Sequence, residues 1–521
     1  MKIKNGCIYL CCLIIGISNV TIAQSVKNKI EKQPNIILIL GDDIGFETVS
    51  AYGSTSYKTP RIDAMAKQGV LFEQCYAQPL CSPSRIQIMT GKSNFRNYEK
   101  WGYLDQNETT FAHLFKSHGY ATCIAGKWQL KGDEYAPYKS GFDEYLLWNL
   151  MDTSSTYNER YKDPKLIENG VMKKYNNGEY GPELFVNFIN NFMERKKDVP
   201  FFVYYPMVLS HKPFVPTPLN QKAYDDFKVV AKGEPGGGKA DNIHFKDEMA
   251  YLDKNVGDII DKVKSLGLLE NTLILFTGDN GTGVGITSKM SDGREIPGNK
   301  GYTNEYGIHV PMVAYWPGKI KPGQINKNLV DFTDFLPTMA DAANITLPAG
   351  FITDGVSLMP QLLGKNYTPR DWLFAHYDPK KGDFPSARFV HNKEWKLYET
   401  GEIYNVIKDP LEKNKIAEKD FQVTEGAPKP IQVNEEKRVQ MQPLKDFFAL
   451  SLFLTLSLVA VYRRVYPYLL GDLLQPLSVI KAEDFSESGG LQKVFSIDIL
   501  FFLLIVATES NGLLGFARKG F

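Results

Sequence analysis

Five short runs of apolar residues, separated by long connections, constrain most strongly what this chain can fold into. Each run is rich in β-branched or aromatic residues and is shorter than a typical helix, which favours strands buried on both faces. The long segments between them suit helices that connect parallel strands. We therefore predict an α/β fold with a large, mostly parallel mixed sheet flanked by helices. The runs are Asn35 to Leu40, Tyr120 to Ala125, Phe201 to Met207, Thr272 to Thr277 and Val310 to Trp316.

Length and composition exclude several classes of protein. A chain of 521 residues predicts roughly two to four domains. Its 43% of hydrophobic residues can fill a packed core, so disorder and coiled coils are excluded. The 60 basic and 59 acidic residues leave a net charge of +1, which gives no support for a nucleic-acid surface. A charged ligand must therefore be bound by a local cluster of side chains.

The first 23 residues have the features of a secretory signal peptide. Lys2 and Lys4 precede an apolar run over residues 7–17, and small residues follow at Thr21 and Ala23. The run is about half the roughly 20 residues of a membrane-spanning helix, which disfavours an anchor. We expect export to the periplasm or beyond. Cleavage would leave Cys75, Cys81 and Cys123, an odd number, so at least one lacks an intramolecular disulfide partner.

Acidic motifs follow the first and the fourth apolar run. Asp42 and Asp43 come after one, and Asp279 and Asn280 come after the other. In parallel sheets, ligands gather beyond the carboxyl ends of the strands. If the two strands are neighbours, three carboxylates and an amide oxygen converge, and their repulsion favours a bound cation. Hard oxygen donors indicate Ca²⁺, or less favourably Mg²⁺, whereas the alternative is that these residues only form turns and helix caps.

A third motif runs from Cys81 to Arg85 with Pro83 between them. It opens a helix-compatible stretch that stops at Gly91. Because proline is tolerated in a first helical turn, Cys81 is expected near a helix N-terminus, where amide groups can bind an anion and Arg85 adds a donor. The alternative is a buried or disulfide-bonded cysteine beside a capped helix.

Together, these motifs resemble those of the type I sulfatases of the alkaline phosphatase superfamily. The order is Gly-Asp-Asp, then Cys-x-Pro-x-Arg, then Gly-Asp-Asn-Gly, and the likeness runs from Asn35 to at least Asn414. It implies a catalytic domain over residues 34–365 and a smaller C-terminal α+β domain over 366–446. Further matching segments are Gly126 to Trp128, His211 to Pro213, Lys300 to Gly301, Phe335 to Thr338, Asp354 to Leu358 and Asp409 to Asn414.

The resemblance also implies a set of roles at the site. Cys81 would be oxidised to formylglycine by a maturation enzyme, and the formylglycine hydrate would be the nucleophile. Arg85, Lys127 and Lys300 would neutralise sulfate oxygens, although solvated surface charge is the alternative for the two lysines. His211, alone or with Lys300, would protonate the leaving alcohol, unless it only makes a structural hydrogen bond. Asp279 could accept a proton, and the Ca²⁺ ligands would be Asp42, Asp43, Cys81, Asp279 and Asn280.

One residue departs from the family pattern. Gln129 stands where the family usually has histidine after Gly-Lys-Trp. An amide forms hydrogen bonds but cannot act as a base near neutral pH, so the elimination of sulfate is expected to be slower. His309 lies in a loop that also differs, and we assign it no catalytic role. His113 and His118 are expected to be ordinary residues of a helix over 109–118.

Substrate choice is expected to depend on variable loops. The segment from Ser93 to Tyr103 carries Arg96, Lys100 and several aromatic residues, which either contact a sugar or pack the loop. The stretch from Lys232 to Lys239 reads as a flexible loop, because no strand leads directly into it as a phosphate cradle requires.

The last segment, residues 447–521, does not fit the family pattern. Phe447 to Tyr462 is a run of 16 residues without charge, followed by two arginines, and Ile497 to Ala507 is a second apolar run. A membrane hairpin or anchor is one interpretation, since the arginines would then face the cytoplasm. The other interpretations are a helix packed on the rest of the protein and a tail that is foreign to the fold.

The function predicted from the sequence is hydrolysis of a sulfate ester on a carbohydrate. A catalytically impaired glycan-binding protein is an alternative, because of Gln129. A phosphoester hydrolase of the same superfamily is less favoured, because such enzymes usually recruit histidine ligands and a Ser or Thr nucleophile.

Overall fold

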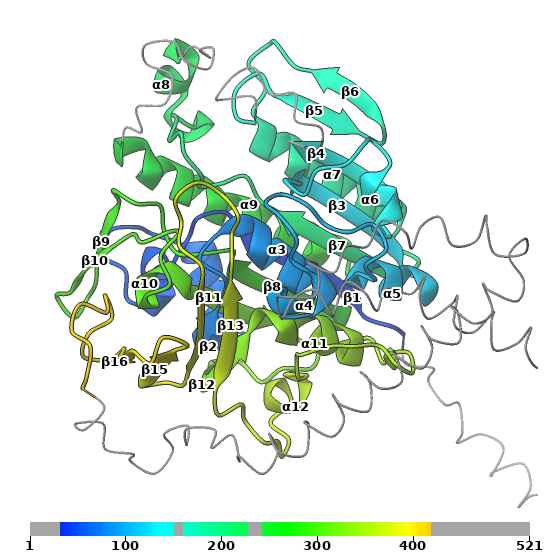
Figure 1. Cartoon of the computed structure of the whole chain (residues 1–521). Helices are drawn as coiled ribbons and strands as arrows, with labels where there is room; N and C mark the ends of the chain where they lie inside the picture. The colour runs from blue at the N-terminus through cyan, green and yellow to red at the C-terminus, as the bar shows by residue number, and fades with distance from the viewer. Residues whose placement is uncertain (1–31, 149, 151–159, 228–241, 418–521) are drawn as a thin grey trace, which may run out of the picture. The chain divides into compact units, whose positions relative to one another are not determined.

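A ten-stranded mixed sheet forms the centre of the computed structural model, which describes residues 32–148, 150, 160–227 and 242–417 (Figure 1). The expectations for residues 1–23, 232–239 and 447–521 lie outside these residues. The strands, in spatial order, are β12 (Gln324–Asp331), β2 (Val70–Tyr76), β11 (His309–Tyr315), β8 (Thr272–Gly278), β1 (Asn35–Gly41), β7 (Phe201–Pro206), β3 (Ala121–Lys127), β4 (Glu144–Trp148), β5 (Lys165–Glu168) and β6 (Val171–Lys174).

All five strands predicted from apolar runs are present. Four of them, β8, β1, β7 and β3, lie side by side and pair in parallel. The fifth, β11, runs antiparallel to both of its neighbours, β2 and β8. Strand β2 was not predicted, because Glu73 and Gln74 interrupt its apolar run. The mostly parallel mixed sheet is thereby confirmed.

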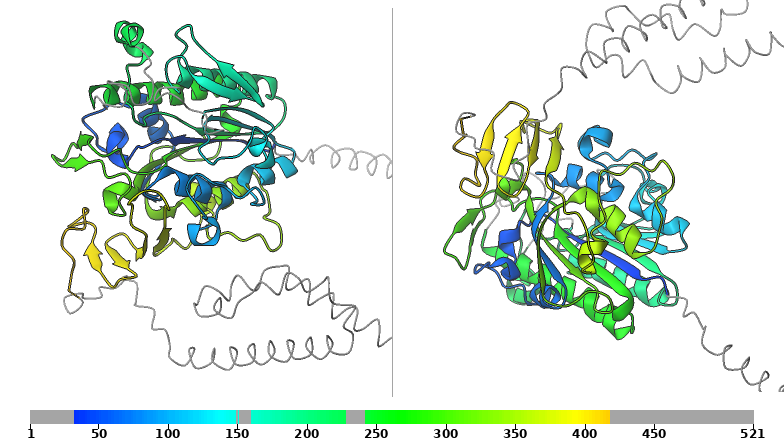
Figure 2. Two further views of the ribbon diagram at one scale, coloured as in Figure 1. Left: turned by 45° about the horizontal axis from the view of Figure 1, so that its top comes forward. Right: turned by 90° about the horizontal axis from the view of Figure 1, so that it is seen from below.

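Helices cover both faces of the sheet (Figure 2). The side chains of β1 alternate between two cores: Ile36 and Leu38 join one, and Ile37 and Ile39 join the other. All four are fully buried, and each such side chain contributes about 1.5–3 kcal/mol of transfer free energy. The helices are α2 (Pro60–Lys67), α3 (Cys81–Thr90), α4 (Asn94–Asn97), α5 (Phe111–Ser117), α6 (Ala136–Lys139), α7 (Gly181–Arg195), α8 (Gln221–Asp226), α9 (Phe245–Ser265), α10 (Glu305–Ile308), α11 (Phe335–Ala342) and α12 (Met359–Leu362).

Local sequence signals set the ends of two of these helices. Helix α3 ends at Gly91, whose φ of 65° is left-handed and favours glycine. Helix α5 begins after Thr110, whose side chain accepts hydrogen bonds from the first-turn amides, while His113 completes the capping box. His118 is the residue after α5, so the expected helix forms over 111–117.

A four-stranded antiparallel sheet follows the strands of the large sheet in the sequence. It packs on the large sheet through Leu373 and Phe389, which cluster with Tyr76 and Leu329. Between 366 and 417 the structure describes strands and loops but no helix, and the rest of the expected 366–446 domain lies outside the described residues. The strands are β13 (Leu373–Tyr377), β14 (Ala387–His391), β15 (Trp395–Tyr398) and β16 (Ile403–Asn405), and a separate hairpin comprises β9 (Thr287–Lys289) and β10 (Glu295–Pro297).

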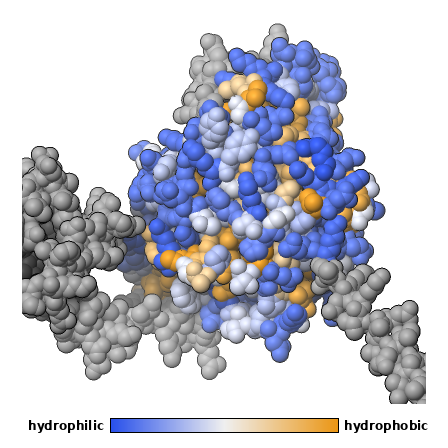
Figure 3. Space-filling view, turned by 90° about the vertical axis from the view of Figure 1, so that its right-hand side faces the viewer, coloured by the Kyte–Doolittle hydropathy of each residue, from blue (hydrophilic) through white to orange (hydrophobic). Residues whose placement is uncertain are grey.

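The surface is mainly hydrophilic on the face seen in Figure 3, with an apolar strip low on that face. Among the described residues, none of the helices has the length and hydrophobicity needed to cross a bilayer. The two apolar segments at 447–462 and 497–507 lie outside that search, so membrane contact stays a prediction.

Candidate active site at the ends of β1 and β8

The parallel register of β1 and β8 brings two acidic motifs together. Gly41 is paired with Gly278, so the chain leaves both strands at the same edge of the sheet. The Asp43 amide donates a hydrogen bond to Asp279 Oδ1 at 3.0 Å, and Asn280 Nδ2 donates to Asp43 Oδ1 at 3.0 Å. The neighbourhood expected from the sequence is thus confirmed.

Three cationic side chains pair with the three carboxylates of this edge. All the carboxylates are buried, with at most 3% of each residue exposed. Part of their charge is therefore offset within the protein, so repulsion among them does not alone establish the metal ion expected from the sequence. The ion pairs are Lys127–Asp42, Lys300–Asp43 and Arg85–Asp279, with N···O distances of 2.7, 2.5 and 2.8 Å.

These ion pairs and burial give the three carboxyl groups different pKa values. Burial raises the pKa of Asp42, but Lys127, His211 and Arg85 together lower it by more, so the pKa lies below its ordinary value. Asp43 behaves alike because of Lys300. Burial, together with the charge of Asp42, raises the pKa of Asp279 to about 6. Asp279 is therefore the acid of this cluster best suited to exchange a proton near neutral pH.

Cys81 is the first residue of α3 and is 1% exposed. Its Sγ donates a hydrogen bond to Gln129 Oε1 at 3.1 Å. Gln129 has a φ of 53°, in the left-handed region that residues other than glycine rarely adopt and that recurs at functional sites. The residue that departs from the family pattern thus contacts the candidate nucleophile directly.

Helix α3 joins Cys81 to the acidic cluster. Arg85, one turn after Cys81, is 1% exposed, lies 3.7 Å from Asp42 Oδ1 and donates to the backbone oxygen of Lys127 at 3.2 Å. The negative charges of Asp279 and Asp42 keep the pKa of Arg85 above its usual value despite burial. The three cysteines of the described residues, Cys75, Cys81 and Cys123, are free and buried, so none of them forms a disulfide with another of the three.

His211 follows β7 and faces the same cluster. Its Nε2 lies 3.8 Å from Asp43 Oδ2, and its side chain is 27% exposed. Burial and the cations Lys300 and Lys127 hold the pKa of His211 well below its usual 6.5. The imidazole is therefore neutral at pH 7 in this charge environment, and an anion beside the two lysines would favour its protonation.

Arg160 is a residue of the site that the sequence did not reveal. It is 4% exposed, and its Nη2 lies 3.1 Å from His211 Nδ1 and donates to the His211 backbone oxygen at 3.1 Å. Its guanidinium lies 4.6 Å from the centre of the Trp148 ring. Arg160 belongs to none of the motifs that carry the family likeness, so only its contacts disclose a positioning role.

The donor set fits a hard divalent cation. Asn280 Oδ1 is buried and has no hydrogen-bond partner among the described residues, which is costly unless another group binds it. Asp42, Asp43 and His211 each offer an atom within 4.8 Å of the others. Carboxylate and amide oxygens favour Ca²⁺ or Mg²⁺ over softer metals, and Asp279 supplies a further carboxylate beside them.

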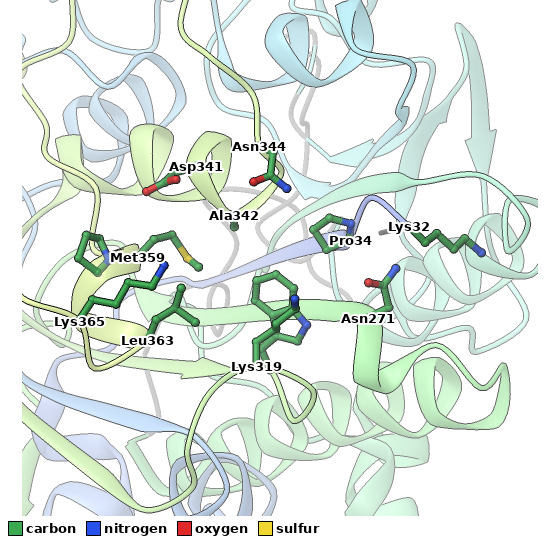
Figure 4. Close-up of a pocket in the computed structure, with 12 residues that line it drawn as sticks. Lys32, Pro34, Asn271, Lys319, Asp341, Ala342, Asn344, Met359, Leu363 and Lys365 are labelled. Carbon is green, nitrogen blue, oxygen red and sulfur yellow. The ribbon is translucent and has the colours of Figure 1, made fainter. Parts of the chain in front are cut away.

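Two other features of the described residues lie outside this site. His309 stacks on Phe46 and lies 2.8 Å from Glu305 Oε1, which is a structural role. A cavity of about 190 Å³ lies at the opposite ends of β1 and β8, where Figure 4 shows Pro34 and Asn271 along its rim. None of the residues that line this cavity is a candidate site residue.

Comparison with known proteins places this geometry in a family. The family model described as "Sulfatase" matches residues 34–345, and the one described as "N-sulphoglucosamine sulphohydrolase, C-terminal" matches 299–429. Arylsulfatase A of Bos taurus is 33% identical over 401 residues, which cover 70% of this chain and 75% of that protein. N-acetylgalactosamine-6-sulfatase of Canis lupus familiaris is 28% identical over 403 residues, with 71% and 74% covered.

Solved structures show the same fold. The PsFucS1 sulfatase from Pseudoalteromonas sp. matches with a TM-score of 0.60 at 22% identity, covering 82% of this chain and 94% of that one. A protein in complex with its substrate D-glucosamine-2-N,6-O-disulfate matches with a TM-score of 0.59 at 21% identity, covering 80% and 97%. The acidic motifs meet at one edge of the sheet, and α3 links Cys81 to them. Since the sulfatase family model also matches residues 34–345, the chain belongs to the sulfatase family.

Proposed function

We propose that this sulfatase removes sulfate from a sulfated carbohydrate, using a nucleophile derived from Cys81. The observation that carries the proposal is the union of the two acidic motifs by the β1–β8 register, with Arg85 of the Cys81 helix paired to Asp279 at 2.8 Å. Conversion of Cys81 to formylglycine by a maturation enzyme supplies a hydrated aldehyde as nucleophile. The signal-like features of residues 1–23 support action in the periplasm or outside the cell.

The side chains around Cys81 have complementary tasks in this proposal. Asp42, Asp43, Asp279 and Asn280 would hold Ca²⁺, which would supply a Lewis acid for the sulfate group. Lys127, Lys300 and Arg85 bind the sulfate oxygens and stabilise the redistributed charge, because preorganised cations act strongly in a buried site. Asp279 accepts the proton of the attacking hydroxyl. His211, placed by Arg160, donates a proton to the leaving alcohol once the bound anion has raised its pKa.

Known relatives support a carbohydrate as the substrate. One relative carries the name N-acetylgalactosamine-6-sulfatase, and one structural neighbour holds D-glucosamine-2-N,6-O-disulfate. Both names specify a sulfated amino sugar. A sulfated hexosamine is therefore the first substrate to test.

The test is a screen of the purified, full-length protein against sulfated mono- and oligosaccharides and the matching phosphate monoesters. We expect release of inorganic sulfate, with the matching phosphate esters hydrolysed more slowly, because the nucleophile motif and the acidic motifs lie within the match to the sulfatase family. Preferred hydrolysis of phosphate would instead identify a phosphoester hydrolase. Saturable binding of sulfated sugars without turnover would identify a glycan-binding protein.

Gln129 gives a prediction of its own. Replacing Gln129 by histidine is expected to raise kcat about tenfold or more, because an imidazole can act as a base during sulfate elimination and an amide cannot. Histidine tolerates left-handed φ values better than most residues, so the backbone should persist. Gln129→Asn, which keeps an amide, is the matched control and should show no gain. A Gln129→His variant with unchanged or lower kcat in stopped-flow and steady-state assays would show that elimination does not limit turnover.

A further inference from the structure

The loop between β13 and β14, residues 378–386, lies against the active site. In Figure 1 it arches up from β13, where the colour passes to yellow. Tyr377, at its start, donates a hydrogen bond to the backbone oxygen of Gly301, the residue after Lys300, at 3.1 Å. Tyr98 Oη donates to the backbone oxygen of Pro379 at 2.9 Å. The small C-terminal sheet and the 93–103 segment therefore meet beside the cations of the sulfate site.

Lys381, in this loop, is an exposed cation that forms no ion pair with a carboxylate among the described residues. Its Nζ lies 3.7 Å from the centre of the Trp101 ring. Partial burial lowers the pKa of Lys381, and Lys300 and Lys127 add to this lowering. The loop that carries Lys381 lies beside Lys300, because Phe384 of this loop packs so closely on Gly301 that a Cβ atom there would lie 2.3 Å from its ring, and Tyr377 bonds to the Gly301 backbone oxygen.

Three other cations of this region have polar partners. Arg96 donates three hydrogen bonds to the carboxylate of Asp354, at 2.8 to 2.9 Å. Lys92 pairs with Glu108 at 2.6 Å. Lys380 donates to the backbone oxygen of Glu99 at 2.8 Å. Of the two interpretations of Arg96, its geometry supports packing of the loop. Lys100, whose Nζ lies 4.4 Å from the centre of the Tyr103 ring, and Lys381 are each held by an aromatic ring, and of these two only Lys381 lies in the loop that contacts Gly301.

We propose that Lys381 binds a second anionic group of the substrate, a carboxylate or a further sulfate, an inference that rests on the proposed function. An ammonium held by an aromatic face retains its charge and can exchange that contact for a charge-assisted hydrogen bond. Trp101 is then a positioning residue, since it keeps the long side chain near the site. The sulfate to be cleaved lies at Lys127, Lys300 and Arg85, and Lys381 selects sugars that carry one more negative charge.

The experiment compares Lys381→Gln with the unaltered enzyme on three substrates. They are an aryl sulfate whose aryl group carries no charge, a disulfated hexosamine and a monosulfated disaccharide that contains a uronic acid. In Lys381→Gln, we expect the KM of the accepted doubly anionic substrate to rise about tenfold with kcat unchanged. The KM for the aryl sulfate should change less than about twofold. The disulfated and the uronic-acid substrates distinguish a second sulfate from a carboxylate.

Controls separate a local effect from a general one. Lys393→Gln removes the same charge from the turn between β14 and β15 and should leave every KM unchanged. Trp101→Phe keeps an aromatic face and should retain the preference, whereas Trp101→Leu should weaken it. Unchanged KM values in Lys381→Gln, or an equal rise for all substrates, would overturn the role of Lys381 alone. Absence of sulfate release by the unaltered enzyme would overturn the proposed function and this inference together.

Discussion

Replacing Cys81 by alanine is expected to lower kcat for sulfate release by about 10⁴-fold or more. The reason is that the substitution removes the atom from which the nucleophile is made, while the cations around it remain. Steady-state assays on a sulfated hexosamine measure the loss. Binding of the same sugar should persist, because Lys127, Lys300 and Arg85 are unaltered.

A second buried cysteine supplies the matched control. Cys123 lies in β3, is fully buried and packs in the core on the face opposite α3. Cys123→Ala should cost roughly 1–2 kcal/mol of stability and leave kcat within about twofold. If Cys81→Ala keeps full activity, or if both alanine variants lose activity equally, Cys81 is not the source of the nucleophile.

Removal of divalent cations is expected to have the second largest effect. Chelation should lower kcat by about 100-fold or more, because Lewis-acid stabilisation of a transferred group is worth several kcal/mol. Added Ca²⁺ should restore activity more completely than Mg²⁺, since the carboxylate and amide oxygens suit the larger ion. Titration of the chelated enzyme with each ion, followed by sulfate release, measures this.

Two buried asparagines sharpen the test. Asn280 and Asn255 are both fully buried, and both have a side-chain oxygen without a hydrogen-bond partner among the described residues. Asn280→Ala should raise the Ca²⁺ concentration for half-maximal activity about tenfold, because it removes a ligand. Asn255→Ala, in α9, should leave that concentration unchanged. Equal responses of the two variants, or full activity after exhaustive chelation, would contradict a cation at Asn280.

The pattern of apolar residues was sufficient to predict the strands that lie in the middle of the sheet. Strands β1, β7 and β8 are buried on both faces, so their residues are almost uniformly apolar. Strands β5 and β6 are short and partly exposed at one edge, and their sequences carry little such signal. The direction of β11 could not be predicted either, because an apolar run does not encode which way its strand is paired.

The candidate site was predictable where function depends on residues directly after a strand or at a helix start. Asp42, Asp279 and Cys81 are of this kind. Arg160 and Lys381 were not predictable, because their roles depend on contacts with His211 and Trp101 that no local pattern records. The pairing of each acid with its own basic residue was likewise hidden, since it arises from side chains of separate elements.

Mass spectrometry of the peptide that contains Cys81 tests the central claim most directly. The protein should be purified from its native host, so that any maturation enzyme has acted on it. An aldehyde at position 81, together with unmodified thiols at Cys75 and Cys123, is the predicted result. An intact thiol at Cys81 in protein that releases sulfate would contradict the account.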